Sequence, residues 1–131
     1  MMVSQLQGSF LTFLVQACKA NRVLDIGTFA GYSAACMAEG LRSRGDGAKV
    51  VTLEKDELCQ RVAKENIEAA GYSDLIEFLL GDASELLELL DNSMPYDLVF
   101  IDANKSGYIK YYNTILERNL LSNDGIIVAD N

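Results

Sequence analysis

Acidic residues recur along the sequence, each at or just after the end of a short apolar run. They are Asp25, Glu54, Asp82, Asp102 and Asp130. Carboxylates accept hydrogen bonds, hold cations and take part in proton transfer. One such acid alone could cap a helix or lie on a solvated loop, but an acid at every strand end favours a shared binding site.

The apolar runs alternate with amphipathic segments of helical length. Five runs have the length and composition of strands, at residues 22–27, 48–54, 75–82, 96–102 and 125–131. Helical patterns follow the first four of them, at 31–44, 56–71, 83–91 and 107–121. A capping box formed by Ser4 and Gln7 predicts a further helix before the first strand.

Strands that alternate with helices predict a parallel sheet covered on both faces. We expect an α/β fold, a doubly wound Rossmann-like sheet of about five strands in the order 3-2-1-4-5, with residues 1–131 forming a single domain. Ligands of such sheets bind outside the carboxyl ends of the strands, where the strand order reverses. The acidic residues lie at those ends.

The composition narrows the class of partner. The chain has 131 residues and a formal net charge of −8, which disfavours nucleic acids and anionic membrane surfaces as partners. No apolar run reaches the length of about 18 residues that a membrane span needs, and the first ten residues lack the pattern of an export signal. The expected location is cytoplasmic.

The thiols and the absence of histidine limit the chemistry. Cys18, Cys36 and Cys59 are widely spaced and form no Cys-x-x-Cys pair, so they are expected to be free thiols in a reducing compartment. The sequence has no histidine, which excludes Ser-His-Asp and Cys-His nucleophilic catalysis. A bound metal would have to rely on oxygen ligands or isolated thiols.

The first turn, "DIGTFAGYS", indicates which kind of cofactor would bind. Gly27 and Gly31 flank Phe29, so the middle glycine of the G-x-G-x-x-G dinucleotide pattern is missing. Such a loop suits a ligand without a pyrophosphate, and Asp25 just before it suits a cationic ligand. Glu54, at the end of the second strand, can accept hydrogen bonds from both hydroxyls of a ribose.

A second group of polar residues follows the fourth and fifth strands. Asp102, Asp130 and Asn131 offer three oxygen donors, which is the ligand type that Mg²⁺ prefers. Lys105 lies three residues beyond Asp102, in "DANK". A lysine that is partly desolvated beside a metal can have its pKa lowered enough to act as a base.

These motifs together resemble those of the cation-dependent, S-adenosylmethionine-dependent O-methyltransferases, the family that contains the catechol and caffeoyl-CoA enzymes. The resemblance runs from Val3 to Asn131. The segments that carry it are "VLDIGTFAGYS", "VVTLEKD", "GDA", "YDLVFIDANKSGYIKYY" and "GIIVADN". Asn104 departs from the acid that is common at its place in bacterial and plant relatives.

The resemblance implies roles for individual residues. It implies that Asp25 supports the cofactor loop, that Glu54 holds the ribose and that Asp102 also belongs to the cofactor site. The residues expected along the methionine part are Gly27, Phe29, Gly31, Tyr32 and Ser33, and those beside the adenine are Asp82 and Ala83. Asp102, Asp130 and Asn131 match the ligands of Mg²⁺ or another divalent cation, and Lys105 matches the proposed general base.

The implied reaction moves a methyl group from S-adenosylmethionine to a hydroxyl of a catechol-like small molecule. Relatives of this family have helices before the first of these elements and strands after "GIIVADN", so the chain is expected to be a shortened core with weak or no turnover. Its fifth strand would then be an exposed apolar edge. The alternatives are an interaction module that pairs through this edge, with a homodimer as one form, and an NAD-dependent oxidoreductase.

Overall fold

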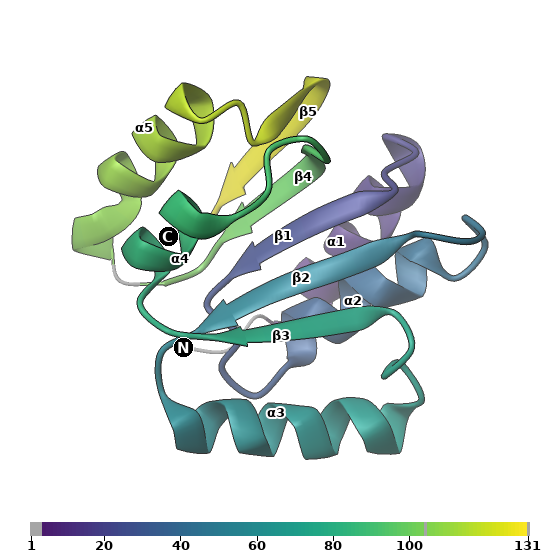
Figure 1. The fold of residues 1–131 in the computed structure, drawn as a ribbon. Coiled ribbons are helices and arrows are strands. Elements are labelled where there is room, and N and C mark those ends of the chain that lie inside the picture. Colours follow the sequence, from purple (N-terminus) through teal and green to yellow (C-terminus); the bar gives the residue numbers. More distant parts are fainter. Residues whose placement is uncertain (1–3, 104, 131) are drawn as a thin grey trace.

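The computed structural model describes residues 4–103 and 105–130 and contains one five-stranded sheet. The strand order is β3-β2-β1-β4-β5 and every neighbouring pair is parallel, which confirms the predicted fold class (Figure 1). The strands are β1 (Arg22–Ile26), β2 (Lys49–Glu54), β3 (Ile76–Leu80), β4 (Tyr96–Ile101) and β5 (Leu121–Ala129). The helices are α1 (Gln5–Ala17), α2 (Tyr32–Leu41), α3 (Glu57–Ala70), α4 (Ala83–Leu89) and α5 (Tyr108–Glu117), with a short 3-10 turn, η1 (Lys105–Gly107), before α5.

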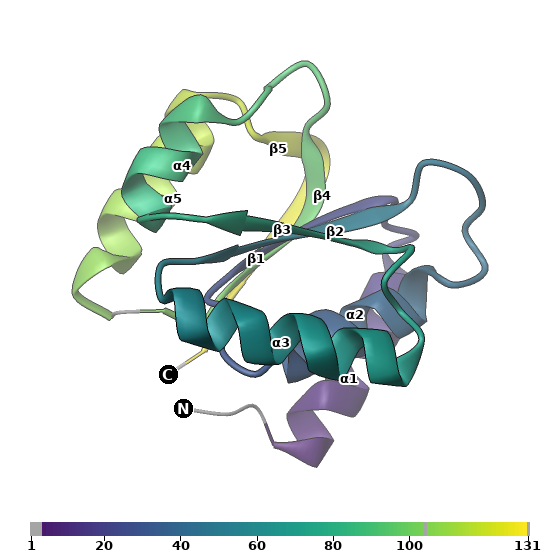
Figure 2. The same ribbon diagram turned by 60° about the horizontal axis from the view of Figure 1, so that its bottom comes forward.

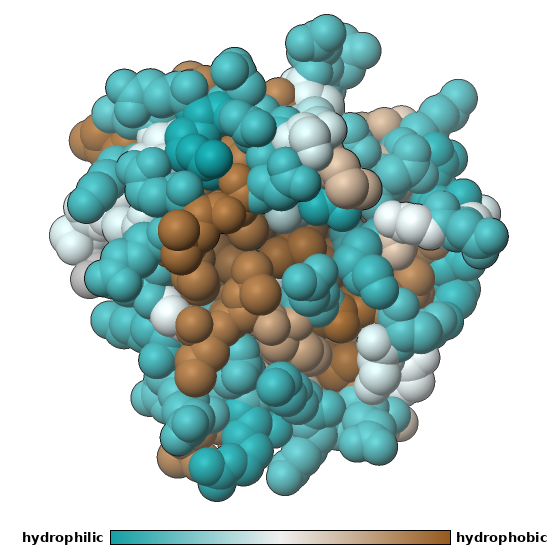
Figure 3. Space-filling view, in the orientation of Figure 1, coloured by the Kyte–Doolittle hydropathy of each residue, from teal (hydrophilic) through white to brown (hydrophobic). Residues whose placement is uncertain are grey.

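The sheet lies between two helical layers. Helices α1, α2 and α3 cover one face, and α4 and α5 cover the other (Figure 2). Successive side chains of a strand point to opposite faces, so β1 sends Val23 into the core beneath α1 and α2 and Leu24 and Ile26 into the core beneath α4 and α5. On the face shown in Figure 3, apolar side chains gather in the middle, over the sheet.

The helix boundaries follow from local capping. Ser4 and Gln7 form the predicted capping box at the start of α1. Asp56 caps α3 by accepting hydrogen bonds from two backbone N–H groups, and α3 ends at Gly71, whose φ is +86°. Asp82 caps α4 in the same way as Asp56 caps α3. Helices α3 and α4 therefore begin at acidic residues that follow β2 and β3 closely.

Strand β5 is the element that differs most from the sequence-based expectation. It begins at Leu121 rather than at residue 125, and its register against β4 is irregular between Tyr96 and Leu98. The polar stretch of residues 122–124, which precedes the predicted strand, belongs to the observed strand. Within the described part of the chain, no strand pairs with the outer edge of β5.

Helix α1 places a different set of residues in the core from the one that its bulkiest side chains suggest. Gly8, Leu11 and Val15 are buried, whereas Leu6 and Phe13 are 81% and 61% exposed. The buried side of α1 packs on α2. Across residues 4–103 and 105–130, no helix is long and apolar enough to cross a membrane.

Candidate functional site

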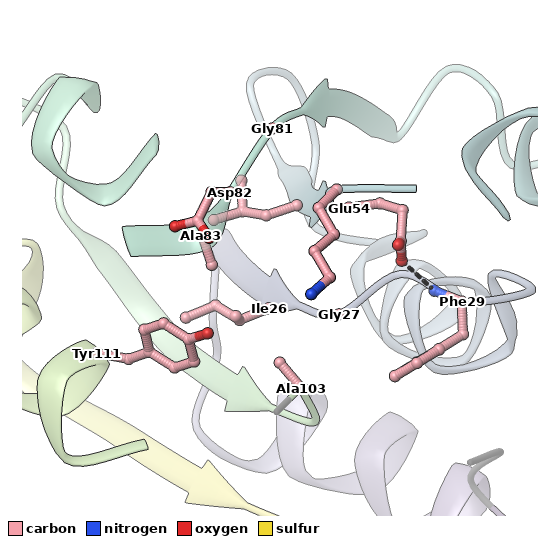
Figure 4. Close-up of a pocket in the computed structure, with 11 residues that line it drawn as sticks. Ile26, Gly27, Phe29, Glu54, Gly81, Asp82, Ala83, Ala103 and Tyr111 are labelled. Atoms are coloured by element: carbon pink, nitrogen blue, oxygen red, sulfur yellow. Dashed lines mark hydrogen bonds between the residues drawn. The ribbon is translucent and has the colours of Figure 1, made fainter. Parts of the chain in front are cut away.

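A pocket of about 360 Å³ opens at the carboxyl ends of β1, β2 and β3, at the edge of the sheet where the acids were expected (Figure 4). Its volume lies within the usual range for small-molecule sites. In Figure 4, Asp82, Ala83 and Tyr111 lie at one end of the pocket, and Glu54 with Phe29 lies at the other. The lining residues are Ile26, Gly27, Phe29, Leu53, Glu54, Lys55, Gly81, Asp82, Ala83, Ala103 and Tyr111.

The turn after β1 requires a glycine at its first position. Gly27 has a φ of +105°, and a Cβ on it would lie 2.1 Å from the backbone oxygen of Asp102, which is closer than atoms can approach. Phe29 also has a positive φ, of 50°. The backbone of this turn is thus forced close to the end of β4, and the N–H of Phe29 is turned toward Glu54.

Glu54 is held with its carboxylate oriented. It is 8% exposed, its Oε1 accepts a hydrogen bond from the N–H of Phe29 at 2.9 Å, and its Oε2 accepts one from the N–H of Asp56 at 3.0 Å. Each carboxylate oxygen has a second lone pair available. Glu54 can therefore accept hydrogen bonds from two adjacent hydroxyl groups of a ligand without moving.

Asp82, at the end of the pocket opposite to Glu54, caps α4 and can also accept a hydrogen bond from a ligand. Its Oδ1 accepts hydrogen bonds from the N–H groups of Ser84 and Glu85 at 2.8 and 3.3 Å, and these bonds begin α4. Oδ2 takes neither of these bonds and can accept one from the amino group of a ligand.

Asp25 lies beneath the turn rather than on the pocket wall. It is fully buried and accepts hydrogen bonds from the hydroxyl of Thr52 at 2.7 Å and from that of Ser33 at 3.3 Å. Burial raises the pKa of Asp25 to about 7, although the bonds from Thr52 and Ser33 lower it. Thr28 and Thr52 are also hydrogen-bonded, at 2.6 Å. The network ties β1, β2 and α2 together behind the pocket.

The structure brings only some of the predicted cofactor residues into this pocket. Gly27, Phe29, Glu54, Asp82 and Ala83 line it. The others, Asp25, Gly31, Tyr32, Ser33 and Asp102, are not among its lining residues. Tyr32 lies instead near α1. A Cβ placed on Gly8 of α1 would be 2.7 Å from the hydroxyl oxygen of Tyr32. The residues predicted for the methionine part are thus divided: Gly27 and Phe29 line the pocket, whereas Gly31, Tyr32 and Ser33 do not.

Asp102 and Asp130 follow the neighbouring strands β4 and β5. Backbone hydrogen bonds continue the strand pairing to both, from Asp102 to Ile26 at 2.9 Å and from Asp130 to Ile101 at 3.0 Å. Burial, followed by the negative charge of Asp130, raises the pKa of Asp102. Two carboxylates that repel each other form an all-oxygen donor set that suits a hard divalent cation.

Two predicted residues of the cation site remain, the ligand Asn131 and the base Lys105. Asn131 lies outside the described residues, and Lys105 is exposed at the start of η1. Among residues 4–103 and 105–130, no three His, Cys, Asp or Glu side chains gather in a group that could hold a metal ion. The cation and its ligand set therefore stay a prediction.

Residues 1–131 match the family model described as O-methyltransferase. The chain belongs to this family. The family resemblance seen in the sequence motifs is thereby confirmed.

Individual relatives of this O-methyltransferase chain agree with the assignment. It is 40% identical to the catechol O-methyltransferase of Niastella koreensis over 98% of its length and 57% of that protein. It resembles the O-methyltransferase of Bacillus cereus in complex with SAH (S-adenosylhomocysteine), with a TM-score of 0.91, 39% identity and coverage of 99% of this chain and 58% of the other. The SAH-bound Podospora anserina methyltransferase PaMTH1 gives a TM-score of 0.92, 40% identity and coverage of 98% and 53%. The chain thus spans little more than half the length of these relatives.

Sequence reasoning missed several residues of the pocket. Lys55 and Ala103 directly follow predicted site residues, so adjacency alone could have suggested them. Tyr111 had no local signal, because it comes from the buried side of α5 and reaches the pocket only through the packing of α5 on the sheet.

Proposed function

We propose that the protein transfers the methyl group of S-adenosylmethionine to a hydroxyl of a catechol-like small molecule with the help of a divalent cation. The observation that carries this proposal is Glu54, whose two carboxylate oxygens are oriented by backbone N–H groups at one end of a pocket of about 360 Å³. The SAH bound in the Bacillus cereus relative and the catechol named for the Niastella koreensis enzyme support it.

The cofactor residues would divide into three groups. Glu54 would accept the ribose hydroxyls, while Asp82 and Ala83 would lie beside the adenine. The residues proposed for the methionine part are Gly27, Phe29, Gly31, Tyr32 and Ser33, supported from below by Asp25. Asp102 would belong to both the cofactor site and the cation site, because it lies against Gly27 and follows the strand beside that of Asp130.

Asp102, Asp130 and Asn131 would hold the cation, for which Mg²⁺ is the first candidate. When bound, such a cation lowers the pKa of a phenolic hydroxyl and attracts the oxygen as a Lewis acid. The donor chemistry of the two carboxylates at the ends of β4 and β5 fits this group. Their mutual repulsion, which contributes to the raised pKa of Asp102, would be relieved by positive charge.

The transfer itself is a displacement at carbon. The phenolic oxygen forms a bond to the methyl carbon while the carbon–sulfur bond breaks, and sulfur keeps that electron pair and becomes a neutral thioether. Lys105, in its neutral form, would accept the phenolic proton. Because the sulfonium already activates the methyl group, the main task of the protein side chains is to position the two reactants.

We also propose a cytoplasmic location. Cys18, Cys36 and Cys59 are free thiols in the structure, which is the usual state in a reducing compartment.

The test is a calorimetric titration of S-adenosylhomocysteine into the full chain. Wild type is expected to bind in the micromolar range, and Glu54→Gln is expected to bind about tenfold more weakly because one charged acceptor of the ribose is lost. Glu65→Gln is the matched control, since Glu65 is exposed on α3 and outside the pocket.

The outcomes separate the candidate functions. A folded chain that binds NADH and not S-adenosylhomocysteine would favour an oxidoreductase. Equal affinity of wild type and Glu54→Gln would remove Glu54 from the site.

A further inference from the structure

Two consecutive residues of α1, Gln7 and Gly8, contact Asp130 and Tyr32, which are both predicted site residues. Nε2 of Gln7 donates a hydrogen bond to Oδ1 of Asp130 at 3.2 Å, across 123 positions of sequence. Gly8, the next residue, is buried against Tyr32 and Cys36, and a Cβ in its place would stand 2.7 Å from the Tyr32 hydroxyl oxygen and from Cys36 Sγ. The start of α1 therefore touches the end of β5 and the first turn of α2.

The cap of α1 sets the orientation of the Gln7 amide. The N–H of Ser4 donates to Oε1 of Gln7 at 2.9 Å, and the hydroxyl of Ser4 accepts from the N–H of Gln7 at 3.2 Å. Because the amide oxygen already faces a donor, the NH₂ group is the part that is directed to Asp130. This hydrogen-bond network assigns the amide orientation.

Asp130 is held by three different elements. Its N–H donates to Ile101 of β4 at 3.0 Å, and its backbone oxygen accepts from the hydroxyl of Tyr108 of α5 at 2.8 Å. These two bonds fix the backbone, whereas the bond from Gln7 acts on the carboxylate. Gln7 donates to Oδ1 and leaves Oδ2 available to a further partner, so it can orient the carboxylate without blocking it.

We propose that Gln7 is a positioning residue that orients Asp130 for cation binding and ties that orientation to the packing of α1 on α2. This inference rests on the proposed function, because it assumes that Asp130 is a cation ligand. Donors to ligating carboxylates typically change metal affinity by about 10- to 100-fold when removed. Gln7 is exposed, so we expect the lower end of that range.

The first experiment measures binding of Mn²⁺ alone to the full chain, from the loss of the electron paramagnetic resonance signal of the free ion. Gln7→Met keeps the side-chain length and removes the amide, and it is expected to weaken Mn²⁺ binding by about tenfold. Ser4→Ala is the control, because it removes the hydroxyl that caps α1 but keeps the backbone N–H that orients the Gln7 amide toward Asp130. Ser4→Ala is expected to bind Mn²⁺ within about twofold of wild type despite a lower free energy of unfolding.

The second experiment uses the side-chain NH₂ signal of Gln7 in ¹H–¹⁵N spectra without metal. That signal is expected to move in Asp130→Ala and to stay in place in the distant variant Asp74→Ala. If it does not respond to Asp130→Ala, the contact is absent in solution and the inference is wrong.

Failure of the inference and failure of the proposed function give different results. If wild type and Gln7→Met bind Mn²⁺ equally, the positioning role is wrong while the cation proposal stands. If wild type binds no Mn²⁺ although the NH₂ signal responds, the cation proposal is wrong and this inference with it.

Discussion

At the scale of single residues, Asp25 makes the stability of the protein depend on pH. Burial raises its pKa from 3.8 to about 7, so the folded chain holds a proton that the unfolded chain has lost between these values. Stability from this group is fully present below pH 3.8 and falls as the pH rises to about 7. At about 1.4 kcal/mol per pH unit, the loss is at most on the order of 4 kcal/mol.

Asp25→Asn tests this dependence, because asparagine keeps an oxygen that can accept the hydrogen bond from Thr52. Urea unfolding at pH 4 and pH 8 is expected to show that the free energy of unfolding of wild type falls relative to that of the variant. The comparison cancels the other acids, which titrate in both proteins. A constant difference between the two proteins over this range would mean that Asp25 is charged throughout.

At the scale of elements, Arg118 stabilises the short helix α4 from the end of α5. Its Nη1 donates to the backbone oxygens of Leu87 and Leu90 at 2.7 and 2.8 Å, which are terminal acceptors of α4. Arg118→Leu is expected to lower the free energy of unfolding by about 1–3 kcal/mol, because these acceptors lose a charged donor. Arg61→Leu, on the exposed side of α3, is the control and is expected to change it by less than about 0.5 kcal/mol.

Because Asp82 of the pocket caps the other end of α4, Arg118→Leu is also expected to affect ligand binding. Loosening α4 should weaken S-adenosylhomocysteine binding in calorimetry by a few-fold, without any contact between Arg118 and the pocket lining. Unchanged stability of Arg118→Leu would show that water replaces the guanidinium at these carbonyls.

Local patterns were sufficient for most elements and for part of the site. Alternating apolar runs located β1 to β4, and residues such as Gly71 and Ser4 marked helix ends, because these signals act within a few residues. Glu54 lines the pocket because the carboxyl ends of parallel strands meet at the same edge of the sheet, while its role toward a cofactor stays a prediction.

What the sequence did not reveal depends on contacts between distant segments. Tyr111 reaches the pocket, Tyr32 lies near Gly8, and Gln7 contacts Asp130 only because of how the helices pack on the sheet. The start of β5 at Leu121 has the same origin, because Leu121 pairs with Tyr96 of β4, a residue distant in the sequence.

At the scale of the whole molecule, an exposed strand edge and a large negative charge have opposite effects on self-association. The outer edge of β5 has no partner among the described strands, and Ile126 is 36% exposed on it. Such an edge favours pairing with a second copy, whereas a net charge of −8 on each chain disfavours it. Salt screens that repulsion, because the Debye length falls from about 14 Å at 0.05 M to about 4 Å at 0.5 M.

We therefore expect the chain to form a homodimer whose share grows with salt, as measured by light scattering behind size exclusion at 0.05 and 0.5 M NaCl. Ile126→Lys is the informative variant, because it places a charge on the edge and at the same time lowers the net negative charge. If this variant becomes monomeric, repulsion between chains cannot be the reason, and the edge of β5 must be the pairing surface. A wild-type chain that is monomeric at both salt concentrations would show that the apolar edge of β5 is not sufficient for association.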